Sequence, residues 1–64
     1  SGGALTTEGK PLKDYVEAFE KTLIDNTMRR HKGSIVAVME ELCLPRRTLN
    51  EKMAKYGLQR SEYT

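Results

Sequence analysis

Apolar residues recur with a helical period over three segments of this chain. In the first segment, from Pro11 to Lys32, they follow at steps of four, three and four, which places them on one narrow stripe of a helix. The stripe comprises Leu12, Val16, Phe19 and Leu23, with Tyr15 at its edge. Ile24 and Met28 lie on another side of the same helix, because each residue advances about 100°. The segment therefore predicts one long helix with two separate apolar surfaces.

The length of this helix predicts a partner for it. Pro11 suits the first helical position, where a missing N–H costs nothing, and Gly33 suits the position after the end. At about 1.5 Å per residue the helix is roughly 33 Å long, too long for the core of a small monomer. The rest of the chain can cover only one apolar surface, so we expect the stripe at 12–23 to form a homodimer interface. The alternative is that the N-terminal half frays in an isolated chain.

Two shorter helices are predicted after Gly33. The first runs from Ser34, a good N-cap, to Leu42, and the second from Pro45 to Tyr56. Their apolar residues are spaced to face a common core, namely Ile35, Val38, Met39, Leu42, Leu49, Met53 and Tyr56. Gly57 should end the last helix, and Leu58 should fold back as a hydrophobic cap contact. No segment alternates with period two, so the predicted fold class is all-α, a long helix followed by a helix-turn-helix.

The turn between the two short helices is expected at residues 42–44. The central position of such a turn favours Gly, because its φ is often positive. Cys43 stands there instead, so we expect slight backbone strain and a small, half-buried, unreactive thiol. A single cysteine forms no internal disulfide and excludes a multi-cysteine zinc site, which fits a reducing cytoplasm.

Sixty-four residues allow one domain. Residues 1–9 are small and polar, with three Gly, and we interpret them as a disordered linker or a remnant of cloning. The domain is expected at residues 10–58, and residues 59–64 are expected to be a loose polar tail. A linker at the start also indicates that the domain was cut from a longer protein.

Charge is unevenly distributed. Residues 1–28 carry three Lys against five Asp or Glu, whereas residues 29–64 carry eight Lys or Arg against four Glu, within a net charge of +2. A basic half of this kind favours a polyanionic partner, here double-stranded DNA. No phosphate loop, metal-ligand cluster or nucleophile pair is present. We therefore predict no enzyme activity, no cofactor, no metal, no small-molecule substrate and no membrane partner, and a cytoplasmic, nucleoid-associated protein.

The exposed side of the last helix carries the candidate DNA-binding residues. Arginine matches the O6 and N7 acceptors of guanine, and asparagine pairs with adenine. We therefore predict base contacts from Arg46, Arg47 and Asn50. Side chains better suited to phosphates are those of Ser34, Thr48, Lys52 and Lys55. Glu17 and Glu20 on the long helix are interpreted as solvated charges. The plainer interpretation is that the last helix is an ordinary solvated basic face.

Residues 33–58, GSIVAVMEELCLPRRTLNEKMAKYGL, resemble the helix-turn-helix of Fis-type DNA-binding domains. The resemblance extends back to Pro11 and is closest to the C-terminal domain of NtrC-type, sigma-54-dependent transcriptional activators. The runs at Leu44–Leu49 and Lys55–Leu58 are its most specific parts. The longer run Leu44–Met53 also resembles regulators of C4-dicarboxylate transport in proteobacteria. The sequence departs from the family at Cys43, where Gly is common, and at Val38 and Met39, where small Ala residues are usual.

This resemblance implies a homodimer held by the long helix and bound to inverted-repeat enhancer sites. It also implies a base contact from Arg46, a phosphate contact from Thr48, and specificity-setting roles for Arg47 and Asn50. In full-length activators an ATPase domain is present, often after a phosphorylatable receiver domain of a two-component system. Two alternatives stay open: a dimeric protein-interaction module with a basic helix, and a stand-alone, nucleoid-associated DNA-bending protein.

Overall fold

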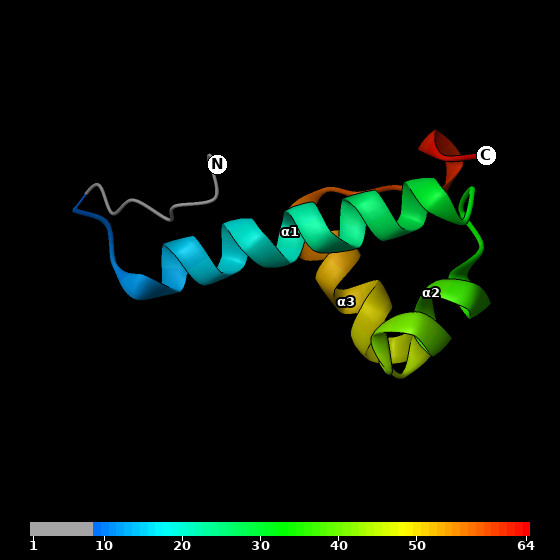
Figure 1. The fold of residues 1–64 in the computed structure, drawn as a ribbon, viewed down its shortest axis with the longest axis horizontal. Helices are drawn as coiled ribbons and strands as arrows, with labels where there is room; N and C mark the ends of the chain where they lie inside the picture. The colour runs from blue at the N-terminus through cyan, green and yellow to red at the C-terminus, as the bar shows by residue number, and fades with distance from the viewer. Residues whose placement is uncertain (1–8) are drawn as a thin grey trace, which may run out of the picture.

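The computed structural model describes residues 9–64 and consists of helices joined by short turns. The helices are α1 (Leu12–Arg30), α2 (Ile35–Leu42) and α3 (Arg46–Tyr56), followed by a single 3-10 turn, η1 (Arg60–Glu62) (Figure 1). No residue of this described part lies in a strand, so the all-α fold with a helix-turn-helix is confirmed. The linker predicted at residues 1–9 falls outside the described residues, apart from Gly9.

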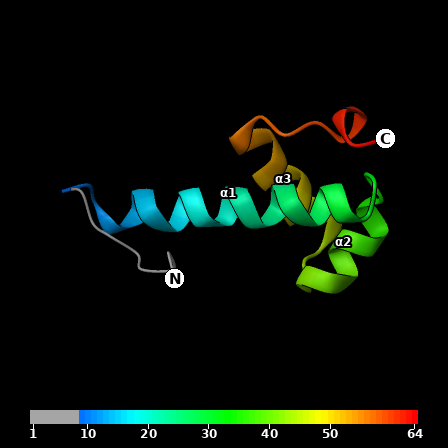
Figure 2. The ribbon, with the colours of Figure 1, turned by 45° about the horizontal axis from the view of Figure 1, so that its top comes forward.

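The short helices pack on the C-terminal half of α1, and its N-terminal turns extend beyond them (Figures 1 and 2). The core between the three helices consists of Ile24, Met28, Val38, Leu49 and Met53. Partly buried apolar side chains surround it, including those of Ile35, Met39, Leu42, Leu44, Tyr56 and Leu58. The periodicity of all three helices therefore identified the core correctly.

The two apolar surfaces of α1 differ completely in exposure. Ile24 and Met28 are 1% and 0% exposed in the core. The predicted stripe lies uncovered, with exposed fractions of 77% for Leu12, 54% for Val16, 66% for Phe19 and 43% for Leu23. Tyr15 at its edge is half-buried, and its hydroxyl accepts the N–H of Lys10 at 3.1 Å. The split between the surfaces is confirmed, whereas the homodimer stays a prediction.

Both prolines lie one position earlier than predicted, at N-caps rather than inside helices. Pro11 and Pro45 have ψ values of 150° and 152°, in the extended range that an N-cap residue adopts. The carbonyl of Pro11 accepts the N–H of Asp14, and that of Pro45 accepts the N–H of Leu49, each at 3.0 Å. Proline fixes only φ, so the same residue serves equally well as the cap.

Helix α1 ends at Arg30, two residues before the predicted end. Lys32 and Gly33 have φ values of 53° and 85°, so the chain leaves the helix through two successive left-handed residues. The N–H of Gly33 donates to the carbonyl of Met28 at 3.0 Å, which is the hydrogen bond of a Schellman cap. The role of Gly33 at the helix end is confirmed.

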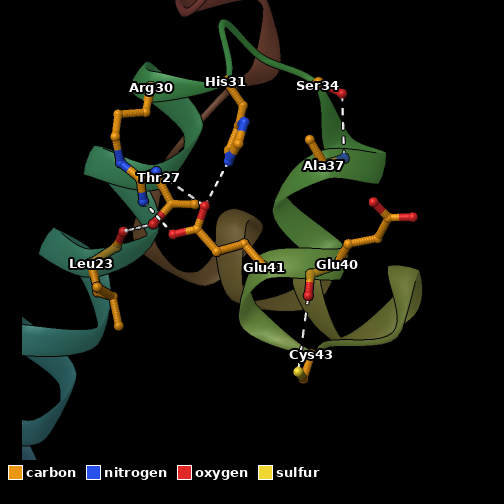
Figure 3. A network of polar contacts seen from close by, with 9 residues as sticks. All are labelled: Leu23, Thr27, Arg30, His31, Ser34, Ala37, Glu40, Glu41 and Cys43. Atoms are coloured by element: carbon orange, nitrogen blue, oxygen red, sulfur yellow. Dashed lines mark hydrogen bonds and ion pairs between the residues drawn. The ribbon is translucent and has the colours of Figure 1, made fainter.

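The helix-turn-helix has the predicted N-cap on α2 and the predicted turn. Ser34 is the N-cap of α2, and its Oγ accepts the N–H of Ala37 at 3.3 Å (Figure 3). Cys43 has a φ of 55°, as expected for the turn, and across it the N–H of Leu44 donates to the carbonyl of Met39 at 3.0 Å. The prediction of a half-buried thiol is wrong. Cys43 is exposed, because a left-handed residue at the tip of a turn directs its side chain outward.

The loose tail predicted at residues 59–64 is also wrong. The ring of Tyr63 packs on the core, and its hydroxyl donates to Asp25 Oδ1 at 2.6 Å. Arg60 Nε donates to the carbonyl of Gly33 at 3.0 Å. A Cβ on Gly33 would come within 3.0 Å of the Thr64 side chain, so the glycine also permits this close approach. One aromatic residue is enough to dock the segment, because its partly buried ring packs on the core and its hydroxyl is paired.

Candidate nucleic-acid interface

The buried residues of α3 determine which of its side chains face solvent. Leu49 and Met53 are 0% and 5% exposed and hold one side of the helix against the core. Arg46, Arg47 and Asn50 are all exposed. The three side chains predicted to contact bases are therefore accessible on one structural element, and their contacts with DNA stay a prediction.

These three residues divide into two groups. Arg46 and Asn50, one turn apart, line a shallow cleft together with Arg60. Arg47 lies on the outward side of α3, where its Nε is 3.4 Å from Glu51 Oε2. The side chains of that pair are 90% and 65% exposed, so the pair stabilises the helix by no more than a few tenths of a kcal/mol. Arg47 can therefore exchange this partner for another anion at little cost.

Lys52 and Lys55 point toward α1 and not toward Arg46. Lys52 Nζ is 3.0 Å from Glu20 Oε2, and Lys55 Nζ is 2.6 Å from Glu17 Oε2. The interpretation of Glu17 and Glu20 as solvated charges is wrong, because residues 32 and 38 positions away reach them across the α1–α3 junction. The assignment of both lysines to DNA phosphates stays a prediction, and each would have to leave an existing ion pair.

A tyrosine joins the same junction. The hydroxyl of Tyr56 donates to Glu20 Oε1, and Glu20 therefore has two partners on α3. Together they lower the pKa of Glu20, the bond from Tyr56 contributing most. The same hydrogen bond raises the pKa of Tyr56 to about 12, because it stabilises the protonated phenol next to a carboxylate.

The predicted phosphate contacts from hydroxyl groups lie elsewhere. Ser34 is exposed at the start of α2, and Thr48 is half-buried in the first turn of α3. Because Ser34 Oγ accepts the N–H of Ala37, its own hydroxyl proton stays available for another acceptor.

A cleft at the start of α2 contains two cations that the sequence analysis missed. It has a volume of about 270 Å³ and is lined by Lys32, Gly33, Ser34, Ile35, Val36, Arg46 and Arg60. We call it the basic cleft, because three of its seven lining residues are cationic and none is acidic. Lys32 was missed because it was assigned to the helix end, and Arg60 because it was assigned to the tail. The sequence signal for Arg60 was Tyr63, the aromatic residue that holds its segment in place.

Glu41 binds two other basic residues near this cleft (Figure 3). Its carboxylate pairs with Arg30, and His31 Nε2 lies 2.7 Å from its Oε1. Hydrogen bonds from Arg30 and then His31 lower the pKa of Glu41 to about 2. The cluster joins the end of α1 to α2 and commits Arg30 to a partner within the protein. Arg30 and His31 therefore bind a group within the protein, whereas the cations of the basic cleft face solvent.

Within residues 9–64, no group of three or more His, Cys, Asp or Glu is placed to hold a metal ion. No helix in this range is both long enough and apolar enough to cross a membrane.

Comparison with known proteins identifies relatives. The model of the family described as "Bacterial regulatory protein, Fis family" matches residues 15–56. The phosphoglycerate transport system transcriptional regulatory protein PgtA of Salmonella typhimurium is 39% identical over 59 residues, covering 92% of this chain and 14% of that protein. The C4-dicarboxylate transport transcriptional regulatory protein DctD of Pseudomonas aeruginosa is 46% identical over 47 residues, covering 73% of this chain and 10% of that protein.

A third relative is the hydrogenase transcriptional regulatory protein HoxA of Bradyrhizobium diazoefficiens. It is 42% identical over 50 residues, which cover 78% of this chain and 10% of that protein. This chain thus spans between about a tenth and a seventh of the length of these curated relatives. No solved structure gives a significant match to the chain.

Proposed function

The chain belongs to the Fis family of bacterial regulatory proteins, so its helix-turn-helix is a DNA-binding domain of a transcriptional regulator, and we propose that it binds inverted-repeat sites as a homodimer. Helix α3 enters the major groove, and Arg46, Arg47 and Asn50 contact base edges. One copy of the domain binds each half of the repeat.

A single arrangement carries this proposal. Leu49 and Met53 are buried against α1 and α2, so α3 is held with Arg46, Arg47 and Asn50 facing solvent. A rigidly held helix with arginine at its N-terminal end suits the major groove, where arginine matches guanine and asparagine matches adenine. The protein-interaction alternative uses the same basic face but has no need of side chains that distinguish base pairs.

The exposed stripe of α1 supports the homodimer. Four apolar side chains in succession, those of Leu12, Val16, Phe19 and Leu23, are each more than two-fifths exposed. Exposed apolar stripes of this kind mark protein interaction sites. A symmetric pair buries the same stripe twice and relates two α3 helices by a two-fold axis. The half-sites would then lie about 34 Å apart, one turn of DNA.

The longer protein from which this segment comes is a second part of the proposal. Its relatives are named transcriptional regulators and are seven to ten times longer than the matched segment. With the resemblance to NtrC-type activators, this supports a cytoplasmic, sigma-54-dependent activator that binds enhancer sites at the nucleoid. Its ATPase activity and any receiver domain lie outside this segment, which itself has no catalytic activity.

Selection from a pool of random duplexes tests the proposal. The 64-residue chain is mixed with the pool, the bound duplexes are sequenced, and binding to the enriched sequence is compared with a scrambled duplex of equal length. We expect an inverted repeat to be enriched. Equal binding to both duplexes with no enrichment would favour a protein partner. Enrichment of bent but unrelated sequences would favour a DNA-bending protein of low specificity.

A further inference from the structure

Most basic residues near the helix-turn-helix are paired with carboxylates. Arg29 pairs with Asp25, Arg30 with Glu41, Arg47 with Glu51, Lys52 with Glu20 and Lys55 with Glu17. Within residues 29–64, only Lys32, Arg46 and Arg60 have no carboxylate partner among the described residues. These three line the basic cleft together. The unpaired positive charge of this half of the molecule is therefore concentrated at one place.

We propose that Arg60 and Lys32, with the Ser34 hydroxyl, bind one phosphate of the DNA backbone in the basic cleft. The segment after α3 would then be part of the DNA-binding surface, and Arg60 would be a phosphate contact. This inference rests on the proposed function, because it places a DNA phosphate beside α3.

The position of Arg60 is fixed before any ligand binds. Its Nε donates to the carbonyl of Gly33 at 3.0 Å, which uses one of its five N–H donors. The Nη groups stay free to donate to two oxygens of an anion, the bidentate geometry in which arginine binds phosphate. Tyr63 secures the segment three residues later, through its bond to Asp25 and the guanidinium of Arg29 5.6 Å from its ring centre. Little side-chain entropy is therefore lost on binding.

The other groups of the cleft complement an anion. The hydroxyl proton of Ser34 is available, because its oxygen already accepts the N–H of Ala37. Lys32, with a φ of 53°, lies in the turn between α1 and α2 and lines the cleft together with Arg60. No acidic side chain lines the cleft. Three donor groups, two from the turn between α1 and α2 and one from the segment after α3, therefore line a space of about 270 Å³.

The location of the cleft favours a backbone phosphate over a free one. Arg46 and Arg60 line both the basic cleft and the cleft that contains Asn50. An anion in the basic cleft would thus lie at the flank of α3, next to the side chains predicted to contact bases. When a helix occupies the major groove, the sugar-phosphate backbone runs along its flanks, and contacts there set the register of the helix.

Binding to the selected duplex by the Arg60→Gln and Lys32→Asn variants tests this site. Asparagine tolerates a positive φ, so the second variant removes a charge without straining the loop and leaves the Arg60–Gly33 bond intact. Lys21→Gln, an exposed lysine of α1 outside the cleft, is the matched control for loss of one charge. Circular dichroism at equal concentration verifies that each variant retains its helix content.

We expect Arg60→Gln to weaken binding at least about tenfold, as for the loss of one charge-assisted hydrogen bond. The slope of log affinity against log salt should fall by about 0.9 for each protomer bound. The enriched sequence should not change, because a phosphate contact carries no base information. Lys32→Asn should act in the same direction, and Lys21→Gln should have a much smaller effect.

Duplexes with a single neutral methylphosphonate linkage locate the phosphate. One such linkage beside the half-site should weaken DNA binding by the wild type. The same linkage should weaken DNA binding by the Arg60→Gln variant little further. Wild-type affinity in both cleft variants, or a loss equal to that of Lys21→Gln, would overturn the proposal while leaving sequence-specific binding intact. Failure of the proposed function would give a different result, because the wild type itself would then enrich no sequence.

A titration with inorganic phosphate, followed through the backbone amide signals of residues 34–36, separates a free anion from a DNA phosphate. Shifts with inorganic phosphate, combined with unchanged DNA binding by Arg60→Gln, would overturn the proposal in favour of a site for free anions. Shifts that compete with the selected duplex would support it.

Discussion

Lys52 Nζ lies 3.0 Å from Glu20 Oε2, so the helix with the candidate base contacts is fastened to the helix with the exposed apolar stripe. Tyr56 donates its hydroxyl to the other oxygen of the same carboxylate. In a homodimer built on α1, the spacing of the two α3 helices depends on the angle between α1 and α3. Glu20 therefore connects the predicted dimer interface to the predicted DNA contacts.

Replacing Glu20 by glutamine tests this junction. The raised pKa of Tyr56 means that its bond stabilises the fold below pH 10, and that this stability is lost as the pH rises toward 12. In Glu20→Gln the pKa of Tyr56 should return toward 10, as measured by its ring proton shifts in an NMR pH titration. The free energy of unfolding at neutral pH should fall by about 1 kcal/mol or less, since the ion pair is partly exposed.

Glu40→Gln is the control for that experiment, because Glu40 is an exposed acid of α2 with no ion pair among residues 9–64. It should leave the titration of Tyr56 unchanged. A Tyr56 that titrates near pH 12 in the Glu20→Gln variant would show that another group causes the shift.

Arg46 is predicted to contribute specificity as well as affinity. Arg46→Ala should cost about 1–3 kcal/mol on the selected duplex and much less on random DNA, because a base contact is lost only where the base is present. Titrations of both duplexes at one salt concentration measure the difference, with Lys21→Ala as a control for charge. An equal loss on both duplexes would assign Arg46 to a phosphate, together with Arg60.

Cys43 stands where the backbone favours glycine. Its φ of 55° costs a residue with a Cβ roughly 1 kcal/mol or more. Cys43→Gly should therefore equal or exceed the wild type in free energy of unfolding, despite the greater freedom of glycine in the unfolded chain. Cys43→Val should be the least stable of the three, because a β-branched residue is strained most at a positive φ. Urea unfolding of the three proteins gives the order, and a Val variant as stable as the Gly variant would contradict the argument.

The sequence was sufficient for features set by local rules. Helical periodicity identified the core residues Met28, Leu49 and Met53, and the preference of a left-handed turn identified Cys43 as strained. Features set by contacts between distant residues were missed. The pairing of Glu17 with Lys55 depends on how α1 crosses α3, and no pattern along the chain encodes that angle.

The candidate site was predictable to a similar extent. The exposed positions of α3 follow from the buried ones, so Arg46, Arg47 and Asn50 were found from spacing alone. Lys32 and Arg60 converge only because Tyr63 docks the last residues on the core. Because residues 59–64 were predicted to be a loose tail, no phosphate contact was predicted for Arg60, although its residue type suits a phosphate.

The Glu41 cluster predicts how stability changes in acid. The pKa of Glu41 is lowered from 4.5 to about 2, so its contribution is present above pH 4.5 and is lost as the pH falls toward 2. Glu41→Gln should unfold at a lower urea concentration than the wild type at pH 7, and the two should converge near pH 2. Glu40→Gln, one residue earlier on α2, should match the wild type at pH 7. A constant difference between Glu41→Gln and wild type at all pH values would mean that the charge of Glu41 does not contribute.

The exposed stripe of α1 predicts the effect of a charge at its centre. Burial of one phenylalanine contributes roughly 1.5–3 kcal/mol, and a two-fold interface buries Phe19 twice. Phe19→Asp should therefore weaken dimerisation by a factor of 100 or more, as measured by sedimentation equilibrium, with little change in monomer helix content because the side chain is 66% exposed. Ala18→Asp, also exposed on α1 but about 100° off the stripe, is the matched control.

Because both half-sites must be held at once, Phe19→Asp should also lose its preference for the inverted repeat over a single half-site. A variant that keeps the wild-type mass and this preference would place the dimer contact elsewhere on the molecule.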